Sequence, residues 1–169
     1  MNLRVLAFLF IAILISCASE EKINPEWANP TLRERHLNLQ MDAWHLAASE
    51  ARLKDYFSVC AEDFVFLGTD STERWTKSEF YSFCKPYFDK GKAWDFRVVK
   101  RYWNFSQSGK VAWFDESLST WMEDCRGSGV VELIDGKWLL KHYNLSITVP
   151  NDLVDSLNSM KSSYYHGQD

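Results

Sequence analysis

The second half of the chain contains four long extended segments, one after another. They cover residues 93–107, 111–121, 125–134 and 137–149, and short turn sequences such as Asp-Gly at 135–136 separate them. Asp-Gly between two hydrophobic runs is a strong signal for a two-residue hairpin turn. The segments exceed the usual strand length of about 5 to 6 residues, so they predict a meander that bends strongly.

Helical patterns lie on either side of this meander. Apolar residues recur at three- and four-residue steps over 37–51, and TLRE at 31–34 has the form of a capping box at the start of that helix. TKSE at 76–79 repeats the form and predicts another helix, which Pro86 is expected to kink or end. A further helix is expected over 151–169.

The order of these elements predicts the fold class. Helices come first, a meander follows, and an early strand at 64–68 is free to join the same sheet, which is typical of α+β proteins. We therefore expect a cone-shaped, strongly curved, mostly antiparallel sheet packed against N-terminal helices, with an added C-terminal helix. A chain of 169 residues with 46% hydrophobic content has room for one substantial core.

The N-terminus carries a targeting segment. Residues 5–15 are apolar and uncharged, a run too short for a spanning helix, which needs about 20 residues. The run ends in Leu14-Ile15-Ser16-Cys17, which resembles the bacterial lipobox, in which the cysteine is lipidated. Residues 1–16 are thus expected to be a lipoprotein signal peptide. A plain secretory signal stays open as the alternative.

Lipidation of Cys17 would make it the N-terminus of the mature protein, and the predicted domain organisation follows from that position. Most of residues 19–30 are polar, and Pro25 and Pro30 interrupt them, so residues 17–30 are expected to be the lipidated cysteine and a tether. A domain at 31–150 and a C-terminal helix and tail at 151–169 are expected to follow. Two or more acyl chains anchor a protein stably. Because Ala18 follows the cysteine, the resemblance implies sorting to the bacterial outer membrane, facing the periplasm or the cell surface.

Charge and cysteine spacing narrow the function classes. The formal net charge is -4 and basic residues are scattered, which argues against a nucleic-acid partner. Cys60, Cys84 and Cys125 match no zinc-binding spacing, so no metal site and no cofactor are predicted. We expect buried free thiols, with a disulfide between Cys60 and Cys84 as the open alternative.

Five stretches carry a family resemblance. They are DFVFLGTD at 63–70, ERW at 73–75, VAWFDE at 111–116, RGSGV at 126–130 and GKWLLKHYNLS at 136–146. In order and spacing they resemble the SnoaL-like domains of the nuclear-transport-factor-two-like superfamily, over roughly residues 32–150. The resemblance implies a cone whose mouth admits a small, often apolar molecule, and a homodimer formed through the sheet. It leaves the activity open, because the superfamily hosts isomerases, dehydratases, cyclases, association domains and noncatalytic binders.

His142 is the main candidate for acid/base chemistry, since an imidazole exchanges protons near neutral pH. Asp115 or Glu116, on a strand expected to lie adjacent or two over in the sheet, is the predicted carboxylate partner. Asp70, in the loop after the first strand, is a further candidate base. A histidine satisfied by a backbone or interface hydrogen bond and a turn-forming Asp70 are the alternatives. Strict alternation would place Leu140, His142 and Asn144 on one face, but both faces are partly apolar, so the inner face stays undecided.

Further polar and aromatic side chains are candidates for ligand binding. Arg126 precedes glycines that let a group approach the strand, so its guanidinium is a candidate to bind a ligand carboxylate or to form a structural ion pair. The predicted ligand-binding residues are Trp75, Trp113, Glu116, Arg126 and Asn144.

These features leave three functions open. The first is a membrane-tethered domain that binds a small, partly apolar organic molecule without changing it. The second is an isomerase, dehydratase or cyclase of the same fold that uses a His–carboxylate pair. The third is a noncatalytic dimeric interaction module whose cone is filled by its own aromatic side chains.

Overall fold

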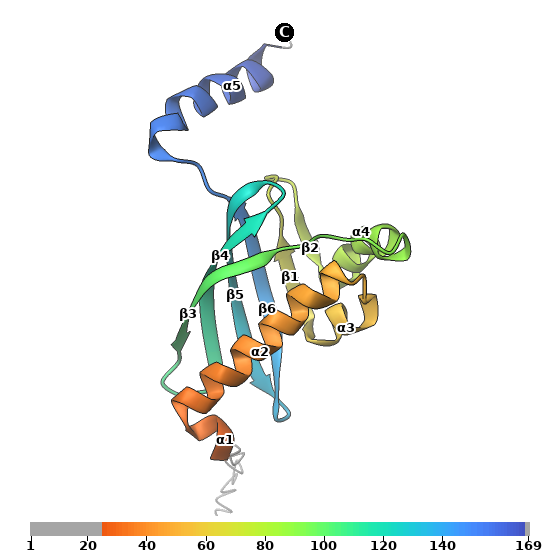
Figure 1. Ribbon diagram of the computed structural model, residues 1–169, viewed down its shortest axis with the longest axis vertical. Helices are drawn as coiled ribbons and strands as arrows, with labels where there is room; N and C mark the ends of the chain where they lie inside the picture. Colours follow the sequence, from red (N-terminus) through yellow and green to blue (C-terminus); the bar gives the residue numbers. More distant parts are fainter. Residues whose placement is uncertain (1–24, 168–169) are drawn as a thin grey trace, which may run out of the picture.

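The computed structural model describes residues 25–167, so the predicted signal peptide and Cys17 lie outside the described residues. The order of the elements follows that predicted from the sequence (Figure 1). The helices are α1 (Pro25–Ala28), α2 (Pro30–Ser49), α3 (Leu53–Ser58), α4 (Lys77–Asp89), the short 3-10 helix η1 (Asn151–Leu153) and α5 (Val154–His166). The strands are β1 (Cys60–Leu67), β2 (Arg74–Thr76), β3 (Arg97–Phe105), β4 (Val111–Thr120), β5 (Glu123–Ile134) and β6 (Lys137–Ile147).

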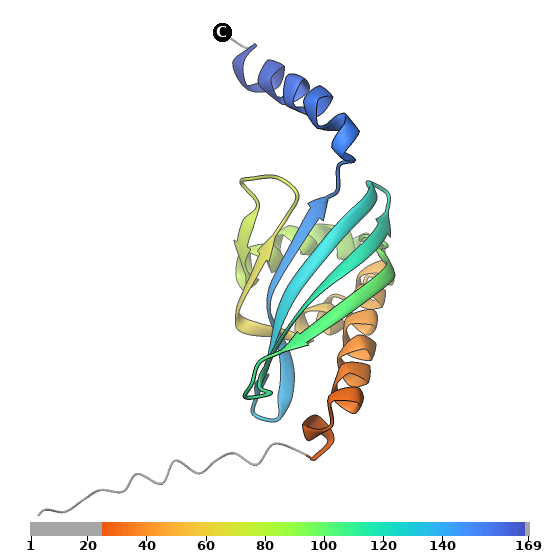
Figure 2. The same ribbon diagram turned by 90° about the vertical axis from the view of Figure 1, so that its left-hand side faces the viewer.

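The six strands form one sheet in the order β2-β1-β6-β5-β4-β3. Every neighbouring pair is antiparallel except β1 and β6, which are parallel. The sheet is strongly twisted, and α2, α3 and α4 lie against its concave side (Figures 1 and 2). The predicted α+β class, with a curved, mostly antiparallel sheet and N-terminal helices, is therefore confirmed.

The two predicted capping boxes behave differently. Thr76 and Glu79 form a complete capping box at the start of α4, as the sequence predicts. At α2 the cap is Asn29, whose side chain accepts hydrogen bonds from the next turn, and the helix begins one residue before Thr31. Pro86 was expected to kink or end α4; it lies inside the helix, which continues to Asp89, so it does not end it.

The end of the expected tether belongs to the folded unit. Residues 25–28 form α1, and α2 begins at Pro30. The side chain of Trp27 is only 7% exposed and its ring lies 4.5 Å from that of His36. An apolar ring buried on this scale fixes α1 against α2.

A β-bulge in β6 changes which side chains face the helices. Val130 of β5 is opposite His142 while Val131 is opposite Leu140, so Lys141 has no Cα partner on β5. Before the bulge Leu140 is buried, and after it Tyr143 and Leu145 are buried. The strict alternation that we expected along β6 does not hold, because one extra residue moves every later side chain to the other face.

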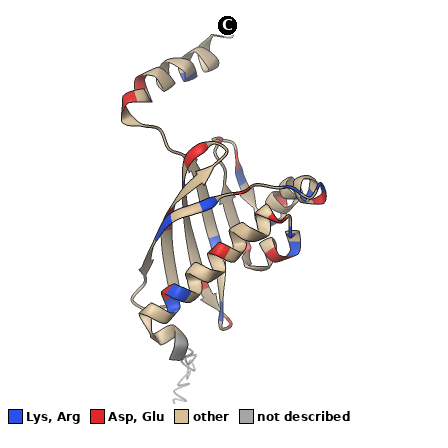
Figure 3. Ribbon diagram, viewed as in Figure 1, with Lys and Arg blue, Asp and Glu red and all other residues tan. Residues whose placement is uncertain are grey.

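The C-terminal helix α5 projects from the end of β6, away from the sheet and the other helices (Figure 1). Its apolar side chains are exposed, including Met160 at 70% and Tyr164 at 69%. Within residues 25–167 no helix is long and apolar enough to span a membrane. Basic and acidic positions are scattered over the side of the molecule seen in Figure 3, with the basic positions of α2 near its start and the acidic ones further along.

Candidate functional site

One carboxylate lies in the core of the cone. Along β4 the side chains of Phe114, Glu116 and Leu118 point toward the helices, and Glu116 is fully buried. A buried carboxylate is costly unless it is paired and hydrogen-bonded. The hydrogen-bond partners of Glu116 therefore determine whether this carboxylate is ionised inside the domain.

Three side chains from three elements form hydrogen bonds with the carboxylate of Glu116. His45 of α2 donates from Nε2 to Oε1 over 2.8 Å, and the hydroxyl of Tyr143 in β6 donates to the same oxygen over 2.7 Å. Arg101 of β3 donates from Nε to Oε2 over 2.7 Å. The carboxylate thus joins the long helix to three strands of the sheet.

The guanidinium of Arg101 extends the network to the surface of α2. Its Nη1 donates to the side-chain oxygen of Asn38 over 3.2 Å and to a carboxylate oxygen of Asp42 over 2.9 Å. The indole of Trp103 donates to the same Asn38 oxygen over 2.9 Å. The Arg101 side chain is 3% exposed, and its Nη2 is buried without a hydrogen-bond partner among the described residues.

The protonation states follow from this geometry. Burial alone would raise the pKa of the Glu116 carboxyl, but the hydrogen bond and charge of His45, the charge of Arg101 and the hydrogen bond of Tyr143 outweigh it and lower the pKa to about 2. Burial, followed by the charge of Glu116, raises the pKa of Tyr143 well above its usual value. Glu116 is therefore ionised at neutral pH, and Tyr143 is a neutral donor.

Gly127 makes room for this arrangement. A Cβ atom at this position would lie 2.1 Å from the Tyr143 hydroxyl oxygen and 2.9 Å from Oε1 of Glu116. The sequence predicts close approach of a group to β5 at its glycines, and the structure shows that the approaching groups belong to the chain itself. At Gly129 the approaching group is the ring of Phe114.

An aromatic pocket opens at the end of the cone from which β6 continues to α5. Its volume is about 190 Å³. Trp75 and Phe83 stack with ring centroids 4.5 Å apart, and Phe66 stacks on Phe80 at 4.0 Å. The remaining lining comes from Gly68, Thr69, Glu73, Trp94, Phe96, Trp121, Met122 and Leu145. We call this cavity the aromatic pocket.

Below this pocket the interior is filled. Trp44 stacks on Tyr56 at 4.8 Å and meets the ring of Tyr143 edge-on at 4.8 Å. These three aromatic side chains are all at most 2% exposed. The space that remains for a ligand in the cone is therefore at its mouth.

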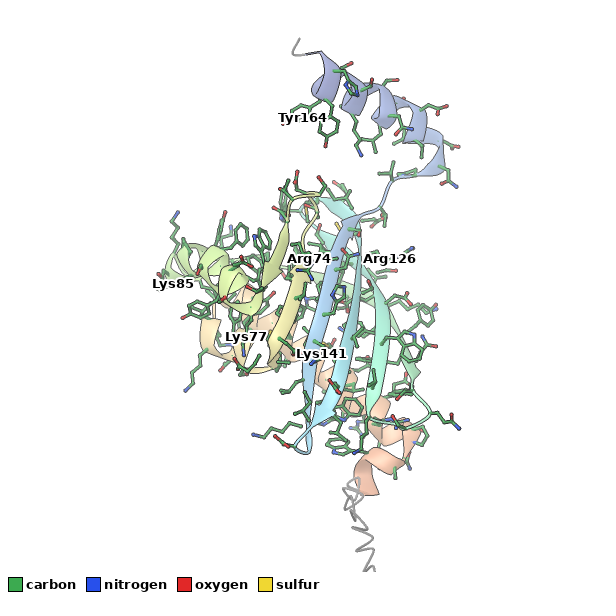
Figure 4. All side chains as sticks on the ribbon, turned by 180° about the vertical axis from the view of Figure 1, so that it is seen from behind. Arg74, Lys77, Lys85, Arg126, Lys141 and Tyr164 are labelled. Atoms are coloured by element: carbon green, nitrogen blue, oxygen red, sulfur yellow. The ribbon has the colours of Figure 1, made fainter. Side chains whose placement is uncertain are left out.

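Most of the predicted site residues lie on the outer face of the sheet, away from the helices. Trp113 is 45% exposed there, and Asp115 alternates with the inward Glu116. Arg126 projects from the same face (Figure 4) and makes no hydrogen bond or ion pair with another described residue. The outer-face set is Trp113, Asp115, Arg126, His142 and Asn144.

The structure does not bring His142 to either proposed carboxylate partner. His142 is opposite Val130, whereas Asp115 is opposite Ser128, and Glu116 lies on the other face. Burial, then the charge of Arg74, lowers the pKa of His142. The catalytic roles of these residues stay predictions, but no acid/base pair between them is formed.

Asp70 lies in the turn between β1 and β2. Its Oδ1 accepts hydrogen bonds from the amide of Thr72 over 2.8 Å and from its hydroxyl over 2.6 Å. These bonds lower the pKa of Asp70. This is the geometry of the turn-forming alternative. Of the predicted residues that the structure describes, only Trp75 lines the aromatic pocket and only Glu116 joins the buried network.

The sequence analysis did not identify the three side chains that bond to Glu116: His45, Arg101 and Tyr143. Two signals were present. His45 is four residues after Met41 on the apolar face of α2, and Glu116 interrupts an otherwise apolar strand face, which calls for buried donors. Tyr143 was hidden by the bulge, which moves it inward.

The three remaining cysteines are free and buried. Burial raises the pKa of the Cys60 thiol to about 12 and also raises that of Cys84. Such thiols are inert packing groups. Residues 25–167 contain no group of three metal-ligating side chains.

Comparison with known proteins agrees with this architecture. Residues 38–150 match the model of the SnoaL-like domain, and the chain belongs to that family. A search of curated proteins finds no match.

Three of the similar solved structures come from bacteria. An NTF2-like protein of unknown function from Pseudomonas putida KT2440 has 13% identity and a TM-score of 0.61, covering 72% of this chain and 91% of its own. A domain of unknown function with a cystatin-like fold from Nostoc punctiforme PCC 73102 has 16% identity and a TM-score of 0.64, covering 79% and 88%. A protein provisionally named a dehydratase of the NTF2-like family, from Streptomyces avermitilis, has 10% identity and a TM-score of 0.61, covering 72% and 100%. At these identities the likeness concerns the fold alone.

Proposed function

We propose that this protein is a lipid-anchored SnoaL-like domain that binds a small, flat, largely apolar molecule in the aromatic pocket. The observation that carries the proposal is the pocket itself, whose walls are stacked aromatic rings such as Trp75 and Phe83. Concave, mostly apolar sites with a few polar groups are the usual form of small-molecule sites. Glu73 and Thr69 supply the polar groups at the rim.

The volume limits the ligand class. Drug-sized ligands occupy pockets of roughly 300–1,000 Å³, whereas an apolar cavity of about 150 Å³ is enough for benzene. A pocket of about 190 Å³ thus fits one or two fused rings. The filled interior below it supports binding at the mouth and not deep in the cone.

The anchor would orient the pocket away from the membrane. Only residues 18–24 separate Cys17 from the start of α1, a span of at most about 28 Å when fully extended. α1 lies at the end of the domain opposite to α5 (Figure 1), and the aromatic pocket opens at the α5 end. In the proposed arrangement the ligand enters from the periplasm or the medium.

A homodimer through the outer face of the sheet is part of the proposal. Trp113, Val130, His142 and Val65 are consecutive Cα partners across four strands on this face. Trp113 is 45% exposed and the other three are partly exposed. An aromatic and apolar centre with charged neighbours such as Arg126 is the composition of many protein interfaces.

The binding proposal is tested by titrating the purified domain with 2-naphthol in a calorimeter. We expect saturable binding that weakens about tenfold in Trp75→Ala, because an aromatic pair contributes about 0.5–1.5 kcal/mol beyond burial. Trp113→Ala is the matched control and should bind as the wild type does. Absence of binding, or equal loss in both variants, would favour the noncatalytic interaction module.

The anchor is tested separately in a bacterial host. Cys17→Ser should move the protein from the membrane fraction to the soluble fraction, whereas Cys60→Ser should not, because Cys60 is buried in the domain. Continued membrane attachment of Cys17→Ser would refute lipidation at this residue.

A further inference from the structure

The lining of the aromatic pocket carries one charged side chain, and that side chain is acidic. Seven of the described residues that line the pocket are aromatic, and Glu73 is the only ionisable one among them. No Lys, Arg or His of the described residues belongs to the lining. An anionic ligand would therefore find no countercharge in this pocket, whereas a cationic ligand would find one.

The carboxylate of Glu73 lies against the backbone of Gly68, which is part of the pocket wall. A Cβ atom at Gly68 would be 2.1 Å from Oε2 of Glu73, so the missing side chain makes room for the carboxylate. The backbone amide of Asp70 donates to the same Oε2 over 3.2 Å. Glu73 forms no ion pair with any residue that the structure describes, so its charge is available to a ligand.

Other acidic residues lie around the mouth of the pocket. Asp70 is in the turn between β1 and β2, which also carries Glu73. The β4–β5 hairpin contributes Trp121 to the lining and continues into the exposed Glu123 and Asp124. Acidic positions of both turns lie at the end of the sheet from which β6 continues to α5 (Figure 3). Charges of one sign around a cleft with apolar walls attract ligands of the opposite sign.

Basic residues that lie close to the lining in sequence do not form part of it. Arg74 projects from the outer face of the sheet (Figure 4), where its charge contributes to the lowered pKa of His142. Arg97 donates from Nη2 to the hydroxyl of Ser119 over 3.4 Å. Lys92 is exposed. The negative charge at the mouth is therefore not neutralised by a basic side chain within the pocket.

Trp121 supplies an accessible aromatic ring at the mouth. Its side chain is 79% exposed, the largest exposed fraction among the large hydrophobic side chains of the described residues. An indole that is exposed to this extent contributes little to the packing of the domain. The face of an indole ring is the aromatic surface that attracts cations most strongly, and aromatic cages recognise quaternary ammonium groups in this way. The mouth thus combines an accessible indole with an available carboxylate.

We propose that the aromatic pocket binds aromatic cations: compounds of one or two rings that carry a quaternary or protonated nitrogen. This inference rests on the binding function proposed above and adds the charge of the ligand to it. The rings of the ligand would lie among the aromatic side chains, and its positive charge would lie near Glu73. A neutral ligand of the same shape gains from burial alone, because it pairs neither with the carboxylate nor with the negative faces of the rings.

The test compares three probes of similar size by calorimetric titration of the purified domain. They are N-methylquinolinium, its neutral isostere 1-methylnaphthalene and the anion 2-naphthoate. We expect the wild type to bind the cation most tightly and the anion most weakly. Raising the salt concentration from about 0.01 M to about 0.15 M should weaken the binding of the cation and leave that of the neutral isostere unchanged, because salt screens the carboxylates.

Two variants separate the charge from the ring. Glu73→Gln keeps an oxygen that can accept the Asp70 amide but removes the charge, so the ratio of cation affinity to isostere affinity should fall about fivefold. Glu62→Gln is the matched control, since Glu62 is 97% exposed and lies outside the lining, and should leave the ratio unchanged. Trp121→Leu keeps an apolar side chain but removes the ring, and should lower the ratio about two- to fivefold.

The possible results are distinct. Wild-type protein that binds 1-methylnaphthalene or 2-naphthoate at least as tightly as the cation would overturn the proposal, as would salt-independent binding of the cation or an unchanged affinity ratio in Glu73→Gln. Equal loss of both probes in Glu73→Gln would also overturn it, because Glu73 would then be needed only for the structure of the pocket. In these cases wild-type binding of 1-methylnaphthalene would still support the proposed binding function, whereas no binding of any probe would refute both.

Discussion

The two faces of the same strands use polar residues in opposite ways. On the inner face Glu116 is fully buried and bonded to His45, Tyr143 and Arg101. On the outer face its neighbour Asp115 is exposed. A polar residue that lies among apolar neighbours on the inner face, such as Glu116, therefore indicates a buried hydrogen-bond network. A polar residue on the outer face, such as Asp115, gives no such indication.

The largest difference between the two faces is expected when one carboxylate on each face is neutralised and the stability of the two variants is compared. Glu116→Gln should destabilise the domain by about 3–5 kcal/mol, because it removes the buried countercharge of Arg101, leaving only the exposed Asp42, and replaces an acceptor oxygen by a donor. Asp115→Asn should stay within about 0.5 kcal/mol. Urea unfolding followed by tryptophan fluorescence measures both. Equal effects would mean that the inner network does not stabilise the fold.

Acid should remove the same stabilisation without a mutation. The folded-state pKa of Glu116 is about 2, below the ordinary 4.5 expected in the unfolded chain, so its contribution is complete above about pH 4.5 and is lost as the pH falls toward 2. The shift corresponds to about 3 kcal/mol. Stability measured against pH should fall steeply in this window. A Glu116→Gln variant that lost stability just as steeply would contradict the assignment to Glu116.

Adding a methyl group at Gly127 tests how closely the side chains on the inner face are packed. Gly127→Ala should cost about 1–3 kcal/mol by overpacking, because its Cβ would meet the Tyr143 hydroxyl. Ser128→Ala, on the outer face of the same strand, is the matched control and should be nearly neutral. Thermal unfolding of both variants is the measurement, and a neutral Gly127→Ala would show that Tyr143 can move without loss.

The smallest effect is expected from His142 on the outer face. Burial and Arg74 lower its pKa, so protonation disfavours the folded state and stability decreases as the pH falls below about 6.5. His142→Gln should flatten this weak dependence. An unchanged slope between pH 5 and 7 in the variant would assign the effect to another group.

The sequence predicted the architecture well because each element has a local cause. The Asp-Gly turn at 135–136 adopts the positive φ angles of 49° and 74° that a tight hairpin requires, and Thr76 caps α4 through the predicted box. The cone, its helices and the C-terminal helix follow from such patterns together with hydrophobic periodicity.

The site was less predictable for a physical reason. The bulge at Lys141 exchanges the faces of β6, so His142 points outward and Tyr143 inward, and nothing in the apolar pattern reports it. The partners of Glu116 come from α2, β3 and β6, far apart in the chain. The sequence named Glu116 as a candidate but left the inner face undecided, so both its burial and the identity of its donors required the tertiary structure.

Native mass spectrometry of the protein purified from its own host would show whether a ligand occupies the aromatic pocket. We expect a bound compound of one or two rings that is retained in Trp113→Ala and depleted in Trp75→Ala. Wild-type protein without any bound compound, or a compound retained equally by both variants, would contradict it.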